Sequence, residues 1–387
     1  MMLYARPLAA SLKAALHDTP VVCVLGPRQS GKTTLARGLG SRYTYVSFDD
    51  AAALAFARAD PAGFVAALPP HAILDEIQRV PELLRTLKLA VDHDRRPGRF
   101  VLTGSANLLL LPKLGDSLAG RMEVVQLHPL TAAELERAPG RFLAALLGGH
   151  LRPAIASAAP QTPLALAGRI VAGGFPEAVA RPAARARAWH REYLRTLLGR
   201  DVQDVARVRD TDAVGRLLEI LALRTGELLN VSSLGNDLDL RRETIEHYLA
   251  VCERLYLVRR LLPWHRNQAS RLIKTPKVHV VDSGLAATLT GLIAADWNTR
   301  RSRFGHLLKS FVVQQRIAQR GGGNVAFLHQ IDDRLDVPVA ERAVFGDRNR
   351  MVVIVAFPRE RLHNHFLGNR GVNAQFFRAT TIRLFSE

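Results

Sequence analysis

An eight-residue segment near the N-terminus contains the residue types that bind phosphate. Residues 26–33 read Gly-Pro-Arg-Gln-Ser-Gly-Lys-Thr, a complete match to the pattern GxxxxGK(S/T). Gly26 and Gly31 let the backbone turn its N–H groups toward phosphate oxygens, at a helix N-terminus that favours anions. Lys32 would reach the β- and γ-phosphates, and the Thr33 hydroxyl would ligate Mg²⁺. We therefore predict a nucleotide-binding loop formed by Gly26, Pro27, Arg28, Gln29, Ser30, Gly31, Lys32, Thr33 and Thr34.

Two adjacent carboxylates, Asp75 and Glu76, follow the apolar run 72–74. An aspartate at the end of a buried strand would hold Mg²⁺ with Thr33, and the glutamate after it would orient and deprotonate the attacking water. A strand that enters a turn would give the same local pattern. However, the Asp75-Glu76 pair follows the phosphate loop with one predicted strand between them, and this position favours a catalytic role. We predict Lys32 and Glu76 as catalytic residues and Thr33 with Asp75 as the Mg²⁺ ligands.

Two more positions could assist the reaction. Thr103, Ser105 and Asn107 end the next apolar run, and we expect Ser105 to help place the water. Capping of the following leucine-rich helix is an equal alternative.

Arg121 precedes the last predicted strand, and we expect it at the carboxyl edge of the sheet. There it could neutralise transition-state charge as an arginine finger, in cis or toward a neighbouring subunit; a surface ion pair is the alternative.

Alternating strands and helices must position these side chains. Apolar runs predict strands, which we place at residues 21–25, 43–48, 72–76, 99–103 and 123–127. Helical stretches connect them, for example at residues 51–59. This alternation predicts an α/β fold with a five-stranded parallel sheet, the P-loop NTPase arrangement.

The composition limits the partners and the compartment. A net charge of +18 suggests a polyanionic partner, most simply nucleic acid, although a solvated arginine-rich surface would give the same value. The sequence has no long uncharged run and no signal-like N-terminus, and its two cysteines lie in apolar runs. We therefore expect a cytoplasmic protein without a membrane partner.

The second half has a different pattern. Residues 136–168 are rich in Ala, Gly and Pro and predict a linker. Three short amphipathic helices, starting near residues 214, 230 and 239, precede a strand at 257–262, which is the layout of a winged helix-turn-helix. The candidate DNA contacts at the start of its third helix are Arg241, Arg242, Thr244 and His247. A winged helix that only packs or binds protein is the alternative.

Six sequence motifs, taken together and in their order along the chain, resemble those of one family: the bacterial and archaeal AAA-type ATPases that have a C-terminal domain of unknown function. The resemblance extends from about Tyr4 to Leu292, and its motifs are found at residues 26–33, 74–79, 102–105, 117–121, 173–177 and 274–285. It implies binding of ATP and Mg²⁺, and it strengthens Arg121 as a candidate arginine finger.

In that family the last segment resembles a PD-(D/E)xK nuclease core, which uses a helix Glu, a strand Asp and a Glu-x-Lys strand to hold a metal. Here Lys309 stands where an acidic residue is usual, Asp336 could be the strand Asp, and residues 353–357 contain neither Glu nor Lys. One carboxylate of three cannot assemble the metal site. We predict a degenerate nuclease-like domain without nuclease activity.

The sequence thus predicts an ATPase domain (1–135), a linker (136–168), a helical and winged-helix region (169–270) and a smaller α/β nuclease-like domain (271–387). The leading hypothesis is a Mg²⁺-dependent ATPase whose winged helix binds DNA. The alternative is a slowly hydrolysing nucleotide switch that acts on a protein partner, and an active nuclease ranks third. An arginine finger in trans would require a homo-oligomer.

Overall fold

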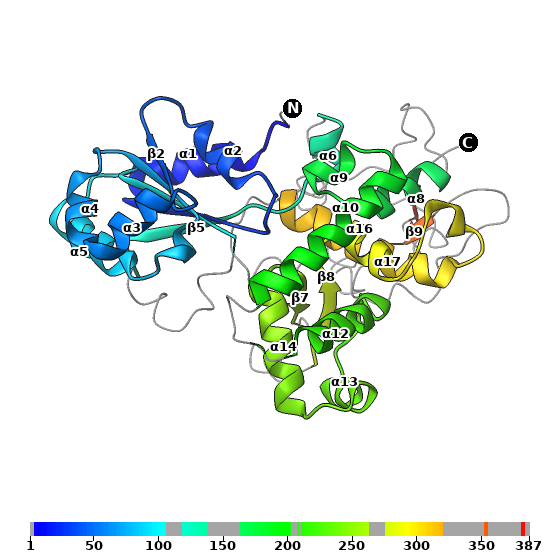
Figure 1. The fold of residues 1–387 in the computed structure, drawn as a ribbon. Coiled ribbons are helices and arrows are strands. Elements are labelled where there is room, and N and C mark those ends of the chain that lie inside the picture. Colours follow the sequence, from blue (N-terminus) through cyan, green and yellow to red (C-terminus); the bar gives the residue numbers. More distant parts are fainter. Residues whose placement is uncertain are drawn as a thin grey trace, which may run out of the picture.

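The computed structural model describes residues 4–105, 118–137, 163–202, 208, 210–262 and 275–319. It also describes two short paired strands, β9 (Val352–Ile354) and β10 (Thr381–Arg383). The described residues form an N-terminal α/β unit and a second unit of helices around a small antiparallel sheet (Figure 1). We call them the first unit and the second unit.

The first unit contains the predicted five-stranded parallel sheet. Its strands are β1 (Val21–Leu25), β2 (Thr44–Ser47), β3 (Ala72–Asp75), β4 (Phe100–Gly104) and β5 (Met122–Gln126). They are ordered β2-β3-β4-β1-β5, and every pair is parallel. Every residue of β1, β3 and β4 is buried, which explains why these strands appear in the sequence as continuous apolar runs.

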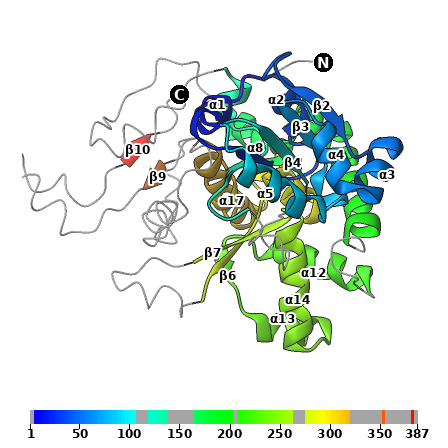
Figure 2. The ribbon, with the colours of Figure 1, turned by 90° about the vertical axis from the view of Figure 1, so that its left-hand side faces the viewer.

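Helices cover both faces of this sheet (Figure 2). The helices are α1 (Leu8–Asp18), α2 (Lys32–Arg37), α3 (Ala51–Ala59), α4 (Pro61–Ala67) and α5 (Leu83–His93). Val22 and Val24 of β1 pack in one cluster with α1 and α2, whereas Cys23 packs in another cluster with α4 and α5. This alternation follows from the two-residue period of a strand. It places β1 between two layers of helices.

The second unit has one large core and a small separate cluster of Leu261, Val313 and Ile317. Its helices are α8 (Pro163–Ala172), α9 (Pro176–Val179), α10 (Ala183–Thr196), α12 (Thr211–Leu223), α13 (Val231–Leu238), α14 (Arg242–Arg254), α16 (Ser283–Leu289) and α17 (Arg301–Gln319). The strands β6 (Glu227–Leu228), β7 (Val258–Leu261) and β8 (Lys277–Val280) pair antiparallel in the order β6-β8-β7. A single cluster of buried side chains runs from α8 to α17.

Two predicted boundaries are wrong. Residues 163–168, assigned to the linker, begin α8. The boundary at residue 271 separates β8 from its partner β7, although Val258 pairs with Val280. Phe304 and Leu307 of α17, which lie beyond that boundary, also belong to the same buried cluster as residues of α8, α10, α12 and α14. Residues 138–162, Asn107 and Asp336 lie outside the described residues.

The cysteines and the described helices bear on the expected compartment. Cys23 and Cys252 are both buried and unbridged. Among the described helices, none is long and apolar enough to cross a membrane.

Candidate nucleotide-binding site

The phosphate-binding loop joins the carboxyl end of β1 to the start of α2. Gly31 caps α2 in the left-handed conformation (φ 98°), which glycine adopts without a steric penalty. A Cβ on Gly26 would lie 2.1 Å from the carbonyl oxygen of Leu127, so a side chain there would force the loop away from the segment after β5. The two glycines are therefore required by this backbone path.

Lys32 is held by the loop itself. Its Nζ donates to the carbonyl oxygens of Gly26 (3.1 Å) and Pro27 (2.8 Å), and only 4% of the residue is exposed. Burial lowers the pKa of Lys32 to about 8, while the charges of Glu76 and Asp75 raise it in part. An anion bound in the loop would take these hydrogen bonds and restore the charged form.

Thr33 and Asp75 meet beneath the loop. The Thr33 hydroxyl donates to Asp75 Oδ2 at 3.0 Å, and Asp75 also accepts hydrogen bonds from the hydroxyls of Tyr45 (2.6 Å) and Thr103. All three donors are neutral, so among the described residues this buried carboxylate has no cation as a hydrogen-bond partner. Carboxylate and hydroxyl oxygens are ligands that suit Mg²⁺.

Few protein ligands would hold such a metal. In the part of the chain that the structure describes, no group of three or more His, Cys, Asp and Glu residues could bind a metal ion. Mg²⁺ commonly takes only one or two protein ligands and completes its shell with phosphate and water oxygens. The pair of Thr33 and Asp75 fits that pattern.

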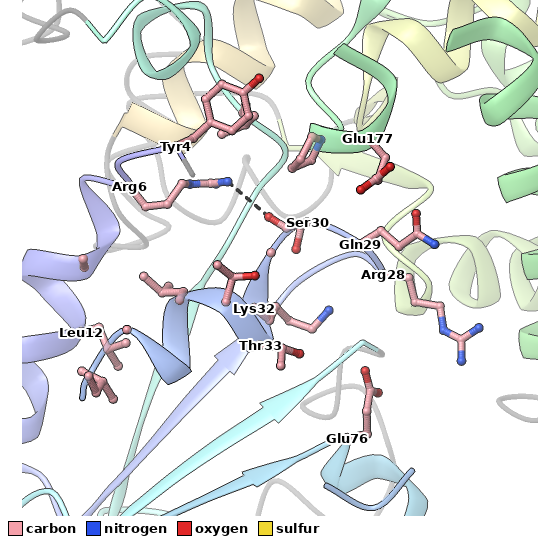
Figure 3. Close-up of a pocket in the computed structure, with 18 of the residues that line it drawn as sticks. Tyr4, Arg6, Leu12, Arg28, Gln29, Ser30, Lys32, Thr33, Glu76 and Glu177 are labelled. Carbon is pink, nitrogen blue, oxygen red and sulfur yellow. Dashed lines mark hydrogen bonds between the residues drawn. The ribbon is translucent and has the colours of Figure 1, made fainter. Parts of the chain in front are cut away.

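Glu76 faces the same cavity from the end of β3 (Figure 3). Its backbone is left-handed (φ 59°), and the Ser105 hydroxyl donates to its Oε2 at 3.2 Å. The structure thus brings Ser105 to Glu76. It also adds Gln78, which the sequence analysis missed and whose amide nitrogen donates to Glu76 and to Ser105.

The second unit forms part of the cavity wall. The cavity measures about 790 Å³, and its lining includes Glu177 and Arg181 near α9 and Trp189 of α10. Figure 3 shows Glu177 on the side of the loop opposite Arg6, whose guanidinium donates to the Ser30 carbonyl at 3.2 Å. The Gly-Gly-Phe-Pro-Glu motif at 173–177 was a sequence signal for this wall.

The second unit also binds the loop directly. Arg28 forms an ion pair with Asp201 (3.1 Å), which lies in the π-helical turn Leu197–Asp201 after α10. The Tyr193 hydroxyl donates to the Arg28 carbonyl at 3.4 Å. The phosphate loop, which belongs to the first unit, is therefore in direct contact with the second unit.

The family of the chain follows from its relatives. Residues 18–136 match the AAA domain, and residues 164–296 match a domain of unknown function, DUF8612. The uncharacterised proteins Rv2008c of Mycobacterium tuberculosis and Mb2031c of Mycobacterium bovis are each 32% identical to the chain over 323 residues, which is 82% of this chain and 67% of theirs. The chain belongs to the family of these two proteins. Its first unit is an AAA-type P-loop ATPase domain.

Two solved structures that the chain matches have TM-scores below 0.5. The Walker-type ATPase PABY2304 of Pyrococcus abyssi is 16% identical, with a TM-score of 0.44, and the match covers 74% of this chain and 96% of that one. RuvB of Thermotoga maritima is 20% identical, with a TM-score of 0.27, and the match covers 65% of this chain and 87% of that one.

Arg121 does not lie where the sequence analysis placed it. It precedes β5, and its carbonyl accepts a hydrogen bond from the backbone of Val21, the first residue of β1 (3.2 Å). Because β1 spans five residues at about 3.3 Å each, Arg121 lies about 16 Å from the phosphate loop along the strand, at the amino edge of the sheet. Its guanidinium pairs with Asp92 of α5. The prediction of a carboxyl-edge position, and with it a finger in cis, is wrong.

The four candidate DNA contacts lie at the start of α14. Arg241 is the residue before the helix, Arg242 begins it, and His247 follows in the second turn; all three are exposed, and Thr244 is half-buried. Arg242 pairs with Glu246 at 3.0 Å on the same exposed face. This end of the helix is accessible.

Proposed function

We propose that this protein is a Mg²⁺-dependent ATPase whose nucleotide state controls a DNA-binding winged helix. One observation supports the ATPase assignment most strongly: Thr33 and Asp75 are hydrogen-bonded beneath the phosphate loop, and Glu76 faces the same cavity. Lys32 would bind the β- and γ-phosphates, and Thr33 with Asp75 would hold Mg²⁺, which would neutralise charge on the phosphates. Family membership favours ATP as the nucleotide.

Glu76 would act as the general base. Its carboxylate would accept a proton from the attacking water, and Ser105, which already donates to this carboxylate, would keep it in place. The residues that form the loop backbone, from Gly26 to Thr34, would surround the phosphates.

The winged-helix proposal is supported by the order of elements in the second unit. The helices α12, α13 and α14 and the strands β6, β7 and β8 follow each other as in a winged helix-turn-helix, and the sheet is antiparallel. The start of α14 exposes Arg241 and Arg242, and the chain has a net charge of +18. These features favour duplex DNA as the partner.

The contacts of Arg28 could couple nucleotide binding in the first unit to DNA binding in the second unit. This loop residue is paired with Asp201, and α10 and its π-helical turn lead toward α12. A bound nucleotide would compete for the Arg28 guanidinium, because phosphate oxygens accept the same donors as a carboxylate.

The test is steady-state ATP hydrolysis with Mg²⁺, with and without duplex DNA, for the wild type, Lys32→Ala and Glu76→Gln. We expect turnover to fall by about 100-fold or more in Glu76→Gln, in the range that loss of a general base produces. We expect DNA to raise the wild-type rate. A wild type that binds ATP but does not turn it over would refute the enzyme assignment.

A nucleotide switch that acts on a protein partner is the second candidate. In this alternative the second unit would bind the partner through an apolar surface, and Arg241 and Arg242 would be ordinary surface residues. Retention on DNA at increasing salt separates the two, because phosphate contacts weaken steeply with salt. Loss of retention in Arg241→Ala/Arg242→Ala would support the DNA function. An active nuclease remains the third and disfavoured reading, since Lys309 on α17 replaces the usual acidic residue.

Arg121 could act only on a neighbouring subunit. From the amino edge of the sheet it would have to exchange Asp92 for the phosphates bound by another copy. A homo-oligomer that forms with ATP, and a rate that falls with dilution, would support this role.

A further inference from the structure

Gln78 closes a small hydrogen-bonded ring around the proposed catalytic carboxylate. Its amide nitrogen donates to Glu76 Oε2 and to Ser105 Oγ (2.9 Å), and Ser105 Oγ donates to the same Oε2 (3.2 Å). Three side chains from two segments, the end of β3 and the end of β4, are thus joined to one another. Glu76 receives its side-chain hydrogen bonds from both of the others.

The backbone around this ring is well anchored. Gln78 lies in the 3₁₀ turn η1 (Ile77–Arg79), and Ile77 is fully buried. The Glu76 N–H donates to Thr103 Oγ1 (3.3 Å), and the Glu76 carbonyl accepts from the Arg79 N–H (3.0 Å). With the backbone of Glu76 fixed, its side-chain torsions are the remaining freedom, and Gln78 restrains them.

The charge on Glu76 selects the orientation of the Gln78 amide. Turned by 180°, the amide would place its carbonyl oxygen against the carboxylate, and both atoms are acceptors. The N–H groups therefore face Glu76 whenever that carboxylate is ionised. Gln78 does not itself line the nucleotide cavity, whereas Glu76 does.

We propose that Gln78 is a positioning residue, which holds the Glu76 carboxylate toward the attacking water through its side-chain amide. This inference rests on the proposed ATPase function. Loss of the Gln78 amide should lower kcat by about 10- to 100-fold, the range expected when a reacting group is misplaced by about 1 Å. The KM for ATP and the affinity for nucleotide stay at wild-type values.

The experiment compares Gln78→Met with Arg85→Met in the full-length protein. Methionine is similar in length to glutamine but cannot donate, and Arg85 is an exposed residue of the next helix. We measure kcat and KM for MgATP, and we measure the affinity for a non-hydrolysable ATP analogue by calorimetry. Gln78→Met is expected to lose kcat alone, and Arg85→Met is expected to match the wild type.

A double variant separates positioning from a general structural role. In the Glu76→Gln background, Gln78→Met should change the residual rate by less than about twofold, because the two residues act through one group. An equal loss in both backgrounds would overturn the inference. So would a wild-type or higher kcat in the single variant.

A second substitution covers the case in which Gln78→Met disturbs folding. Gln78→Glu keeps the shape and places a like charge beside Glu76, so kcat should fall at least as far, with nucleotide affinity kept. A wild-type kcat in Gln78→Glu would overturn the inference. The outcomes remain distinct from failure of the proposed function, which would show as no turnover in the wild type or no loss in Glu76→Gln.

Discussion

The two units differ in how far apart along the chain their key residues lie. In the first unit the phosphate loop is one uninterrupted strand, loop and helix. In the second unit the organising residue is Asp282, which is fully buried and accepts hydrogen bonds from the backbone of Gly174 (2.7 Å) and from Gln314 (3.0 Å). Gly174 is 108 residues away and Gln314 is 32. A local site is visible as one motif, whereas the sequence does not show that two distant motifs meet at one hydrogen-bond centre.

Asp282 also caps the helix that follows it. Its Oδ1 accepts from the backbone of Gly284 (2.9 Å) and Leu285 (3.1 Å) at the start of α16. A Cβ on Gly173 would lie 2.2 Å from this oxygen, so the glycine pair lets α8 and α16 approach each other. The motifs at 173–177 and 274–285 are therefore two parts of one structural centre.

The largest expected effect comes from removing this centre. Asp282→Ala leaves several buried donors without a partner, and we expect the free energy of unfolding of the second unit to fall by about 3 kcal/mol or more. All three tryptophans (189, 264 and 297) lie in the second half of the sequence, and Trp189 and Trp297 pack in the core of the second unit, so tryptophan fluorescence in urea reports on its unfolding.

Asp296→Ala is the matched control, because Asp296 is only half-buried and accepts from the backbone of Ile293 (3.0 Å). Loss of such a cap costs about 1 kcal/mol. Equal effects of the two substitutions would mean that Asp282 is an ordinary helix cap.

A smaller effect is expected from pH on the first unit. Because burial lowers the pKa of Lys32 to about 8 in the free protein, the charged form that binds phosphate is lost above that value rather than above 10.5. We expect ATP affinity to be nearly constant below about pH 8 and to fall by about tenfold per pH unit above it, about 1.4 kcal/mol. Calorimetric titrations across this range measure it.

Lys32→Ala should bind weakly and show no break near pH 8. If the ATP affinity of the wild type began to fall only near pH 10, the loop would not lower the pKa of Lys32.

The smallest effect is expected where the two units meet. The Arg28 side chain is 35% exposed, so its pairing with Asp201 should contribute about 1 kcal/mol or less. A double-mutant cycle of Arg28→Ala and Asp201→Asn, followed by urea unfolding, gives the coupling energy.

The pair of Arg195 and Glu192, which is largely exposed, is the control, with an expected coupling near zero. Equal couplings would indicate that the Arg28 contact does not join the units more strongly than a surface pair.

Much of the first unit could be predicted because its elements are local. The five strands were expected close to their observed positions, and α3 begins and ends as expected. Lys32, Thr33, Asp75 and Glu76 meet because the carboxyl ends of parallel strands share one edge. Arg121 was misplaced since it precedes its strand, which puts it at the opposite edge.

Other features had no local signal. Gln78 follows Glu76 by two residues, but only the turn after β3 and the end of β4 bring its amide to both Glu76 and Ser105. The boundary at residue 271 failed because strand pairing between β7 and β8 joins segments that the sequence pattern separates.

Sequence patterns alone were enough to predict the phosphate-binding loop, the buried strands around it and the carboxylates Asp75 and Glu76 at the end of β3, because each depends on residues adjacent in the chain. The second wall of the cavity, the ring around Glu76 and the contact between Arg28 and Asp201 became visible only in the folded chain. These contacts join residues far apart in the chain. Their formation depends on how whole helices and sheets pack, which no local pattern specifies.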